Sequence, residues 1–257
     1  MKVVILAGGF GTRISEESYL KPKPMVEIGG QPILWHIMKY YSEFGFNDFV
    51  ICLGYKQYVV KEYFAQYFLH TADITFDLAN NRMEVLHKHA EPWKVTLVDT
   101  GLMTMTGGRI KRVREYLGEE PFLLTYGDGV SNVDIHALVK FHESHGRICT
   151  ITGVNVGQQF GVMAIDESGQ IREFREKNDD DGRIVNGGFM VMNPKIFDYI
   201  EGDDTVLEKA PLENLAKDGQ LMVYQHHGFW KGMDTQRDHK QLEEMWDGGN
   251  APWKIWS

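Results

Sequence analysis

The sequence is poor in cysteine and in long apolar runs, and it carries no excess of positive charge. Two cysteines among 257 residues cannot build a disulfide framework or a four-ligand zinc site. A net charge of -9 at pH 7 argues against a broad nucleic-acid-binding face, because duplex binding usually needs a basic patch. No apolar run is long enough to span a membrane, and the run after Met1 is too short for a signal peptide. We therefore expect a cytoplasmic protein that binds neither nucleic acid nor membrane.

Strand-like and helix-like patterns alternate through the first half of the chain. Continuous apolar runs of the kind found in strands buried on both faces lie at Lys2–Ala7, Phe49–Leu53 and Phe122–Tyr126. Helical patterns follow Gln31-Pro32, span Tyr58–Phe68 and run from Ile135 to Gly146. This rhythm predicts an α/β fold with a Rossmann-like, mixed but mostly parallel sheet flanked by helices.

The second half of the chain changes character and predicts a smaller antiparallel region. Short strand-like runs joined by turns lie at Arg147–Val156, Gly161–Asp166, Ile171–Glu176 and Ile184–Met192. Helical patterns return at Thr205–Lys217 and Gln236–Trp246. The stretch from Tyr67 to Thr100 looks irregular, as an excursion from the sheet with a turn at Asn80-Asn81. Because no linker rich in proline or serine divides the chain, we expect one domain over residues 1–257.

A glycine-rich loop directly follows the first expected strand, in the segment LAGGFGTR. Gly8, Gly9 and Gly11 let the backbone approach a ligand closely, and successive N–H groups in such a turn bind anions. Arg13 adds a fork of donors suited to phosphate oxygens. A purely structural turn is the alternative. The loop fails the dinucleotide-binding pattern, because Ile14 stands where its last glycine belongs, and it also lacks the lysine of a P-loop. These failures disfavour an oxidoreductase or an ATPase.

A second basic segment, KPKPMVEIGGQP, places Lys23 between two prolines that stiffen its approach. Taken alone, Lys23 also fits a solvated loop lysine. Together the two segments resemble the signature of the sugar-phosphate nucleotidylyltransferases, LAGGxGTRL followed by KP and PVxGKP. The chain departs from it at Ile14, Glu27 and Gln31, none of which removes a phosphate ligand. The resemblance runs through nearly the whole chain and implies the nucleotide-diphospho-sugar transferase fold.

The resemblance implies nucleotide-binding roles for one set of residues: Leu6, Ala7, Gly8, Gly9, Gly11, Thr12, Arg13, Lys23, Thr100, Gly101, Tyr126 and Gly127. It also implies a Mg²⁺ ion held by Asp128, in TYGDG, and Asp234, in GMDT. Mg²⁺ prefers one or two carboxylates completed by phosphates and water. By themselves the two residues also fit a turn aspartate and a helix N-cap, respectively.

Sugar-side contacts are implied for Gly161, Glu176, Lys177, Asn186 and Gly187. Lys177 would orient the attacking phosphate, so the resemblance gives catalytic roles to Arg13, Lys23, Asp128 and Lys177. The nucleotide part would span about residues 1–130, the sugar part about 131–235, and a C-terminal helix and tail 236–257. A charged, solvated turn is the alternative reading of Glu176 and Lys177.

The run VDTGLMTMTGGR, which lacks the Gln-Pro segment of many relatives, resembles the cytidylyltransferase branch of the family. The implied partners are CTP and glucose 1-phosphate, giving CDP-glucose for lipopolysaccharide O-antigen sugars, in a homo-oligomer of which a hexamer is one form. An acceptor near Thr100–Leu102 could select the amino group of cytosine over uracil. Alternatives are the same chemistry with UTP or dTTP, and a non-catalytic protein that binds nucleotide sugars.

Overall fold

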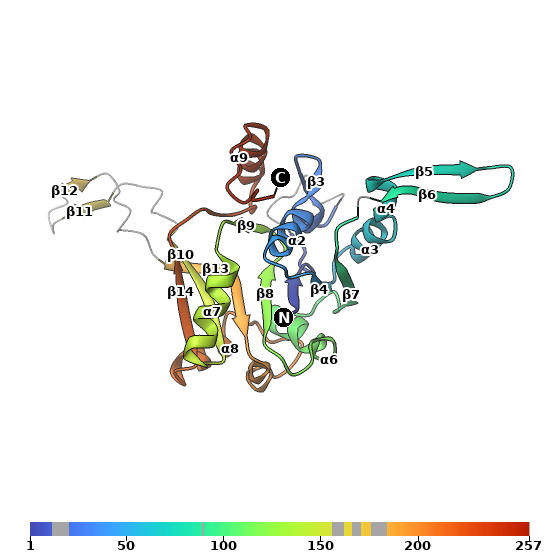
Figure 1. The fold of residues 1–257 in the computed structure, drawn as a ribbon. Coiled ribbons are helices and arrows are strands. Elements are labelled where there is room, and N and C mark those ends of the chain that lie inside the picture. Colours follow the sequence, from blue (N-terminus) through green and yellow to red (C-terminus); the bar gives the residue numbers. More distant parts are fainter. Residues whose placement is uncertain (12–20, 89, 156–161, 166–170, 176–183, 257) are drawn as a thin grey trace.

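A seven-stranded mixed sheet forms the centre of the molecule (Figure 1). The computed structural model describes residues 1–11, 21–88, 90–155, 162–165, 171–175 and 184–256. The strand order is β14 (Leu221–His226), β10 (Cys149–Asn155), β13 (Ile184–Met192), β8 (Phe122–Tyr126), β1 (Val3–Leu6), β4 (Asp48–Leu53) and β7 (Lys94–Asp99). Only β13 runs against its two neighbours, and the other adjacent pairs are parallel. The predicted mixed, mostly parallel sheet is therefore confirmed.

Alternation along the buried strand β1 divides the core between the two faces of the sheet. Val3 and Ile5 pack with side chains of α2 (Ile33–Glu43) and α7 (Ile135–His145). Val4 and Leu6 pack with side chains of α5 (Thr106–Arg112), α6 (Arg114–Leu117) and α8 (Ala210–Lys217). Because successive side chains of a strand point to opposite faces, one apolar run holds both helical layers. The other helices of the described residues are α3 (Gln57–Ala65), α4 (Tyr67–Thr71), α9 (Gln236–Asp247) and the 3₁₀ turns η1 (Lys23–Met25) and η3 (Pro194–Tyr199).

The predicted antiparallel strands of the second half divide between two sheets. β10 and β13 pair in the central sheet, whereas β11 (Val162–Ile165) and β12 (Ile171–Arg175) form a separate antiparallel pair. Two further short pairs are β2 (Glu27–Ile28) with β3 (Gln31–Pro32), and β9 (Gly129–Ser131) with β15 (Trp230–Gly232). Within the described ranges, no helix combines the length and the apolar character that crossing a membrane requires.

The stretch expected to be irregular contains a two-stranded ribbon that projects from one end of the molecule (Figure 1). β5 (Ala72–Asp77) pairs antiparallel with β6 (Arg82–Lys88). The predicted turn at Asn80-Asn81 is confirmed: Asn81 has φ 51°, and the Asn80 backbone N–H donates to the Asp77 carboxylate at 3.1 Å. The stretch is thus mostly regular, since α4 and the sheet strand β7 also lie in it. The alternating polar and apolar residues of the ribbon explain why it lacked a continuous apolar run.

Candidate active site

The glycine loop leaves the carboxyl end of β1 and is held on both sides by neighbouring strands. Gly127 donates its N–H to the Leu6 carbonyl at 3.0 Å, and Ala7 donates to Cys52 at 3.0 Å. A side chain at Gly8 would overlap the Arg109 guanidinium, and Gly11 has φ 63°, so these two positions suit only glycine. The loop therefore packs closely against Arg109 at Gly8, while its backbone at Gly9 stays accessible.

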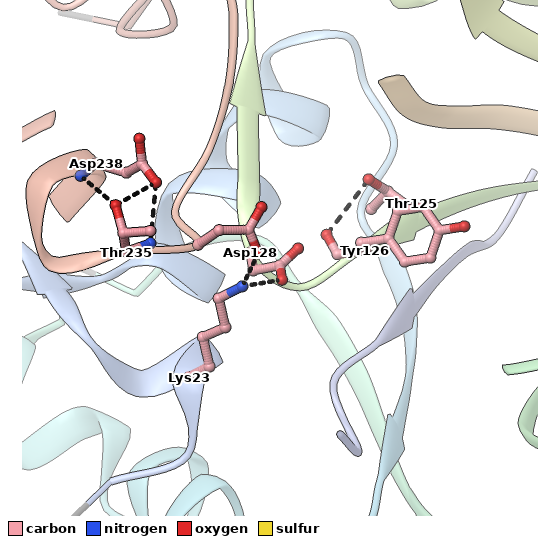
Figure 2. Close-up of polar contacts among 7 residues, drawn as sticks. Lys23, Thr125, Tyr126, Asp128, Thr235 and Asp238 are labelled. Carbon is pink, nitrogen blue, oxygen red and sulfur yellow. Dashed lines mark hydrogen bonds and ion pairs between the residues drawn. The ribbon is translucent and has the colours of Figure 1, made fainter. Parts of the chain in front are cut away.

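Lys23 brings together the two aspartates predicted to bind a metal, and Figure 2 shows its side chain against Asp128. Its Nζ lies 2.6 Å from Asp128 Oδ2 and 2.8 Å from Asp234 Oδ1. The Lys23 side chain is 10% exposed, whereas those of Asp128 and Asp234 are 35% and 47% exposed. Three residues widely separated in the sequence thus form one ion cluster whose carboxylates still reach the surface.

The pairing of β9 with β15 explains why the two aspartates meet. Asp128 directly precedes β9, and Asp234 is separated from the end of β15 only by Met233. Gly129 lies opposite Gly232 where the two strands pair. Met233 N–H donates to the Asp128 carbonyl at 2.8 Å and extends this pairing by one step. The alternative that Asp234 is a helix N-cap is wrong, because Thr235 caps α9 and forms a capping box with Asp238.

The charges of the ion cluster determine the pKa of Lys23. Burial by itself lowers the pKa of Lys23, but the Asp128 carboxylate, with help from Asp234, outweighs it and raises the pKa above the usual lysine value. Lys23 therefore carries a full positive charge at neutral pH and offsets part of the charge on the two carboxylates.

The donor chemistry of this cluster fits Mg²⁺. Asp128 and Asp234 supply two carboxylates that already converge on one cation, and hard divalent ions favour such oxygen ligands. Among the described residues, no group of three or more His, Cys, Asp or Glu side chains could hold a metal. The protein thus offers two ligands here, and phosphate oxygens and water would supply the others.

The glycine loop and the ion cluster open into one pocket of about 450 Å³. It contains these predicted site residues: Leu6, Ala7, Gly8, Gly9, Gly11, Lys23, Tyr126, Gly127, Asp128 and Asp234. One wall of the pocket is formed by the segment from Leu102 to Met105 with Thr106 and Arg109, and Phe10 and Pro24 also line the cavity. Apart from Leu102, which ends the segment Thr100–Leu102 considered for base selection, the sequence analysis selected none of these residues. Apart from Thr100 and Gly101, the predicted nucleotide-binding and metal-binding residues within the described ranges therefore line a single cavity.

Thr100 and Gly101 lie one layer behind this wall. Thr100 is fully buried, and its hydroxyl donates to the Leu53 carbonyl at 2.7 Å. Neither residue lines the pocket, whereas the adjacent segment from Leu102 to Met105 does. Arg109 donates to the Thr100 hydroxyl at 2.8 Å and to the Gly101 carbonyl at 2.7 Å.

Arg109, on α5, is a functional candidate that the sequence analysis missed. Its guanidinium donates to the Gly8 carbonyl at 3.0 Å, to Gly101 at 2.7 Å and to the Leu102 carbonyl at 3.2 Å. Arg109 is 5% exposed, and burial lowers its pKa. One side chain thus joins the glycine loop to the opposite wall. The sequence offered no signal that separated it from the neighbouring Lys111 and Arg112.

The predicted sugar-side residues Asn186 and Gly187 lie in β13, next to Gly188, which packs against the ring of the pocket residue Tyr126. Asn186 accepts the Gly188 N–H at 2.9 Å and makes a side-chain hydrogen bond with Tyr126. The Tyr126 hydroxyl donates to Glu208, and burial followed by the Glu208 charge raises the pKa of Tyr126. Asn186 therefore connects β13 to the nucleotide pocket through Tyr126. The other predicted site residues, Thr12, Arg13, Gly161, Glu176 and Lys177, lie outside the described residues.

Comparison with known proteins agrees with this geometry. The model of the family described as "Nucleotidyl transferase" matches residues 2–235. The chain is 58% identical to "Glucose-1-phosphate cytidylyltransferase" of Salmonella typhi, over 100% of both chains. It is 29% identical to "Mannose-1-phosphate guanylyltransferase catalytic subunit beta" of Dictyostelium discoideum, over 93% of this chain and 62% of the relative.

The fold also matches solved structures. The crystal structure of HddC from Yersinia pseudotuberculosis superposes with a TM-score of 0.68 at 24% identity, covering 95% of this chain and 99% of that one. At this identity the match concerns the fold alone. With the family model spanning most of its length and a full-length relative above half identity, the chain belongs to the nucleotidyl transferase family.

Proposed function

We propose that the chain transfers CMP from CTP to α-D-glucose 1-phosphate and releases CDP-glucose and pyrophosphate. The observation that carries this proposal is the 58% identity, over the full length of both chains, to the Salmonella glucose-1-phosphate cytidylyltransferase. The pocket supports it independently, because a glycine loop, a buried lysine and two aspartates surround one cavity. The specific metal, Mg²⁺, is part of the proposal.

The residues of the pocket would act mainly by positioning and by neutralising charge. Backbone N–H groups of the loop from Gly8 to Gly11 would bind the polyphosphate, and Lys23 would neutralise it. Asp128 and Asp234 would hold Mg²⁺, which when bound offsets negative charge on the phosphate oxygens. We further propose that Arg13 binds phosphate beside Lys23, as the family signature implies.

The proposed reaction needs no covalent intermediate on the protein. A phosphate oxygen of glucose 1-phosphate attacks the α-phosphorus of CTP in line, a new P–O bond forms, and the bond to the β-phosphate oxygen breaks. Lys177 would orient this attacking phosphate. Glu176, Gly161, Asn186 and Gly187 would bind the hexose, and the contact of Asn186 with Tyr126 would place it against the nucleotide.

Base selection would reside in the wall from Leu102 to Met105, which Arg109 holds against the glycine loop. Thr100 and Gly101 would act through this backbone. We propose that residues of about 1–130 bind the nucleotide, that about 131–235 bind the sugar, and that 236–257 support Asp234. The site then lies where the first two parts meet, since Asp128 belongs to one and Asp234 to the other.

We also propose that the chain works as a cytoplasmic homo-oligomer supplying CDP-glucose for O-antigen sugars. The unpaired, buried thiols of Cys52 and Cys149 agree with a reducing compartment. Self-association is supported by the ribbon of β5 and β6. Phe76 and Met83 lie opposite each other on one face of it and are 57% and 49% exposed.

Pyrophosphate release with CTP, UTP, dTTP and ATP, each paired with several hexose 1-phosphates, tests the reaction. We expect the highest kcat/KM with CTP and glucose 1-phosphate in the presence of Mg²⁺. Equal turnover with UTP would contradict the choice of CTP. No release with any pair would favour a protein that binds nucleotide sugars without catalysis.

A further inference from the structure

We propose that Lys23 is a built-in competitor of the divalent metal: without nucleotide its ammonium occupies the two carboxylates, and the polyphosphate must attract it away for the metal to bind tightly. The proposal rests on the metal-binding part of the proposed function. It adds a second role to a residue that the family resemblance assigns only to the phosphates. Metal and nucleotide would then bind cooperatively, and the metal would enter with the nucleotide.

The geometry of the cluster makes the competition direct. Asp128 Oδ2 and Asp234 Oδ1, both within 2.8 Å of the same Lys23 Nζ, are two oxygens that a shared metal would use. Mg²⁺ binds oxygen at about 2.0–2.1 Å, so an ion on this pair would lie close to the ammonium. Two cations at such a distance repel strongly in a partly buried site.

Lys23 has little freedom to move aside without a new anionic partner. Its side chain is 10% exposed, and Pro22 and Pro24 flank it in the η1 turn. An ammonium that left the carboxylates for an apolar wall would lose two ion pairs and gain none. Lys23 does line the nucleotide pocket, however, together with the glycine loop. A bound polyphosphate would therefore place negative charge within reach of Lys23 and release the carboxylates.

The charges of the cluster lead to the same conclusion. Asp128, Asp234 and Lys23 together carry a single net negative charge, whereas the two carboxylates alone would carry two. A divalent ion is therefore attracted only weakly while Lys23 remains paired. Polyphosphate adds several negative charges, which can neutralise the lysine and ligate the metal at once. The partial exposure of both aspartates leaves the metal a route from the pocket.

Metal binding without nucleotide gives a direct test. Free Mn²⁺, measured by electron paramagnetic resonance during titration of the full chain, reports the dissociation constant of the metal alone. We expect Lys23→Met to bind Mn²⁺ at least about tenfold more tightly than the wild type, because a competing cation is lost. Lys23→Arg, which keeps the charge, should stay close to wild type.

Lys94→Met is the control, because Lys94 pairs with Asp48 at 3.4 Å and neither residue lines the pocket that holds the ion cluster. It should leave the Mn²⁺ affinity unchanged. Unchanged or weaker Mn²⁺ binding by Lys23→Met would overturn the proposal, and so would an equal gain in Lys94→Met. The titration contains no CTP, so a failure of the cytidylyl-transfer proposal would not alter its outcome.

A second measurement uses the wild type and does not depend on the folding of a variant. Acylation of Lys23 by acetic anhydride, followed by mass spectrometry, reports whether its amine is engaged. We expect labelling of Lys23 to rise over the Mn²⁺ range in which the metal binds, while labelling of Lys94, outside the pocket, stays constant. Labelling of Lys23 that does not respond to saturating Mn²⁺ would show that lysine and metal do not compete.

Discussion

At the scale of single residues, the site depends on charges that are only partly withdrawn from water. Asp128 and Asp234 are about one-third and one-half exposed, and Lys23 beneath them is buried. This graded burial leaves the carboxylates accessible, while the lysine that organises them stays fixed. Arg109 is a second buried cation at the pocket, and its guanidinium donates to the backbone carbonyls of Gly8, Gly101 and Leu102.

Asp128→Asn tests the role of the metal-binding carboxylates. The amide keeps the shape of the side chain but removes its charge, which matters most when charge develops on the transferred phosphoryl group. We expect kcat for pyrophosphate release to fall about 100-fold or more, with a smaller change in KM for CTP. Asp48→Asn, which alters only an exposed pair with Lys94, is the control and should keep wild-type kinetics. Wild-type rates for Asp128→Asn at every Mg²⁺ concentration would remove Asp128 from the metal site.

His36 makes folding sensitive to acid. It is fully buried, its Nε2 lies 2.7 Å from the Ile28 carbonyl, and its Nδ1 lies 3.4 Å from the donor Trp253 Nε1, so a neutral ring fits both contacts. Burial lowers the pKa of His36 from 6.5 to about 4. Below pH 6.5 the unfolded chain therefore takes up a proton that the folded chain refuses until about pH 4. The stabilisation is complete above pH 6.5 and is lost as the pH falls through this window.

We therefore expect the free energy of unfolding to decrease by up to about 3 kcal/mol on account of His36 between pH 6.5 and 4. Urea denaturation at several pH values measures this slope. His36→Gln should flatten it, because an amide can still donate to Ile28 but does not titrate. His136→Gln, at an exposed position, should leave the slope as in the wild type. An equally steep slope in His36→Gln would assign the acid sensitivity to other groups.

At the scale of elements, the sequence predicted what a single segment determines. The bounds of β8 at Phe122–Tyr126 agree with the structure, because a continuous apolar run followed by Gly127 identifies a buried strand by itself. Pairing between distant segments was not predictable in this way. Nothing near Asp128 specifies that β9 pairs with β15, more than 95 residues later, although this pairing brings the aspartates together.

The helix α5 shows a second reason why parts of the fold were not predicted from the sequence. Gly107 and Gly108 lie in its first turn and weaken its helical signal, so the sequence did not predict it. In the structure a side chain at Gly108 would come within 2.5 Å of the Asp203 carbonyl, and one at Gly107 within 2.8 Å of the Thr205 carbonyl. Close backbone packing therefore requires these glycines, and tertiary contact overrides helix propensity. Arg109 follows them directly, which is why its role was also missed.

The start of α9 couples an element to the site, since Asp234 immediately precedes the N-cap residue Thr235. Thr235 accepts the Asp238 N–H at 3.2 Å, and the Asp238 carboxylate accepts the Thr235 N–H at 2.9 Å (Figure 2). Burial acts to raise the pKa of Asp238, but hydrogen bonds from Lys231 and Thr235 outweigh it and lower the pKa. The Asp238 carboxylate thus stays charged, and its hydrogen bonds with Thr235 fix the backbone next to Asp234.

Thr235→Ala removes the capping hydroxyl next to Asp234. We expect the free energy of unfolding to fall by about 1 kcal/mol. We also expect kcat to fall about tenfold, because a neighbour that orients a metal ligand affects activity beyond its effect on stability. Denaturant titration and pyrophosphate release measure the two effects. Thr235→Ser keeps the hydroxyl and should restore both; a loss of stability without a loss of activity would separate the cap from the site.

At the scale of the whole molecule, the sheet and the ribbon serve different purposes. The sheet positions the site: β1 and β8 end side by side, so the glycine loop and Asp128 emerge at the same edge. No residue of the ribbon lines the pocket, and the ribbon projects from one end of the molecule (Figure 1). Ile74, Phe76, Met83 and Val85 alternate onto one face of the ribbon, because Ile74 lies opposite Val85 and Phe76 opposite Met83. An isolated two-stranded ribbon is marginally stable in water, so this face calls for a covering surface.

We expect that surface to be supplied by a second copy of the chain, as the proposed homo-oligomer requires. The double substitution Phe76→Ser and Met83→Ser removes the two large exposed side chains of the apolar face without touching the pocket. Multi-angle light scattering should give an oligomeric mass for the wild type and a smaller mass for the double variant at the same concentration. The control, Thr75→Ser with Glu84→Gln, changes an opposed pair on the other face of the ribbon and should keep the wild-type mass. An unchanged mass for the double variant would place the contact between subunits elsewhere on the molecule, because exposed apolar side chains contribute to association only where they become buried.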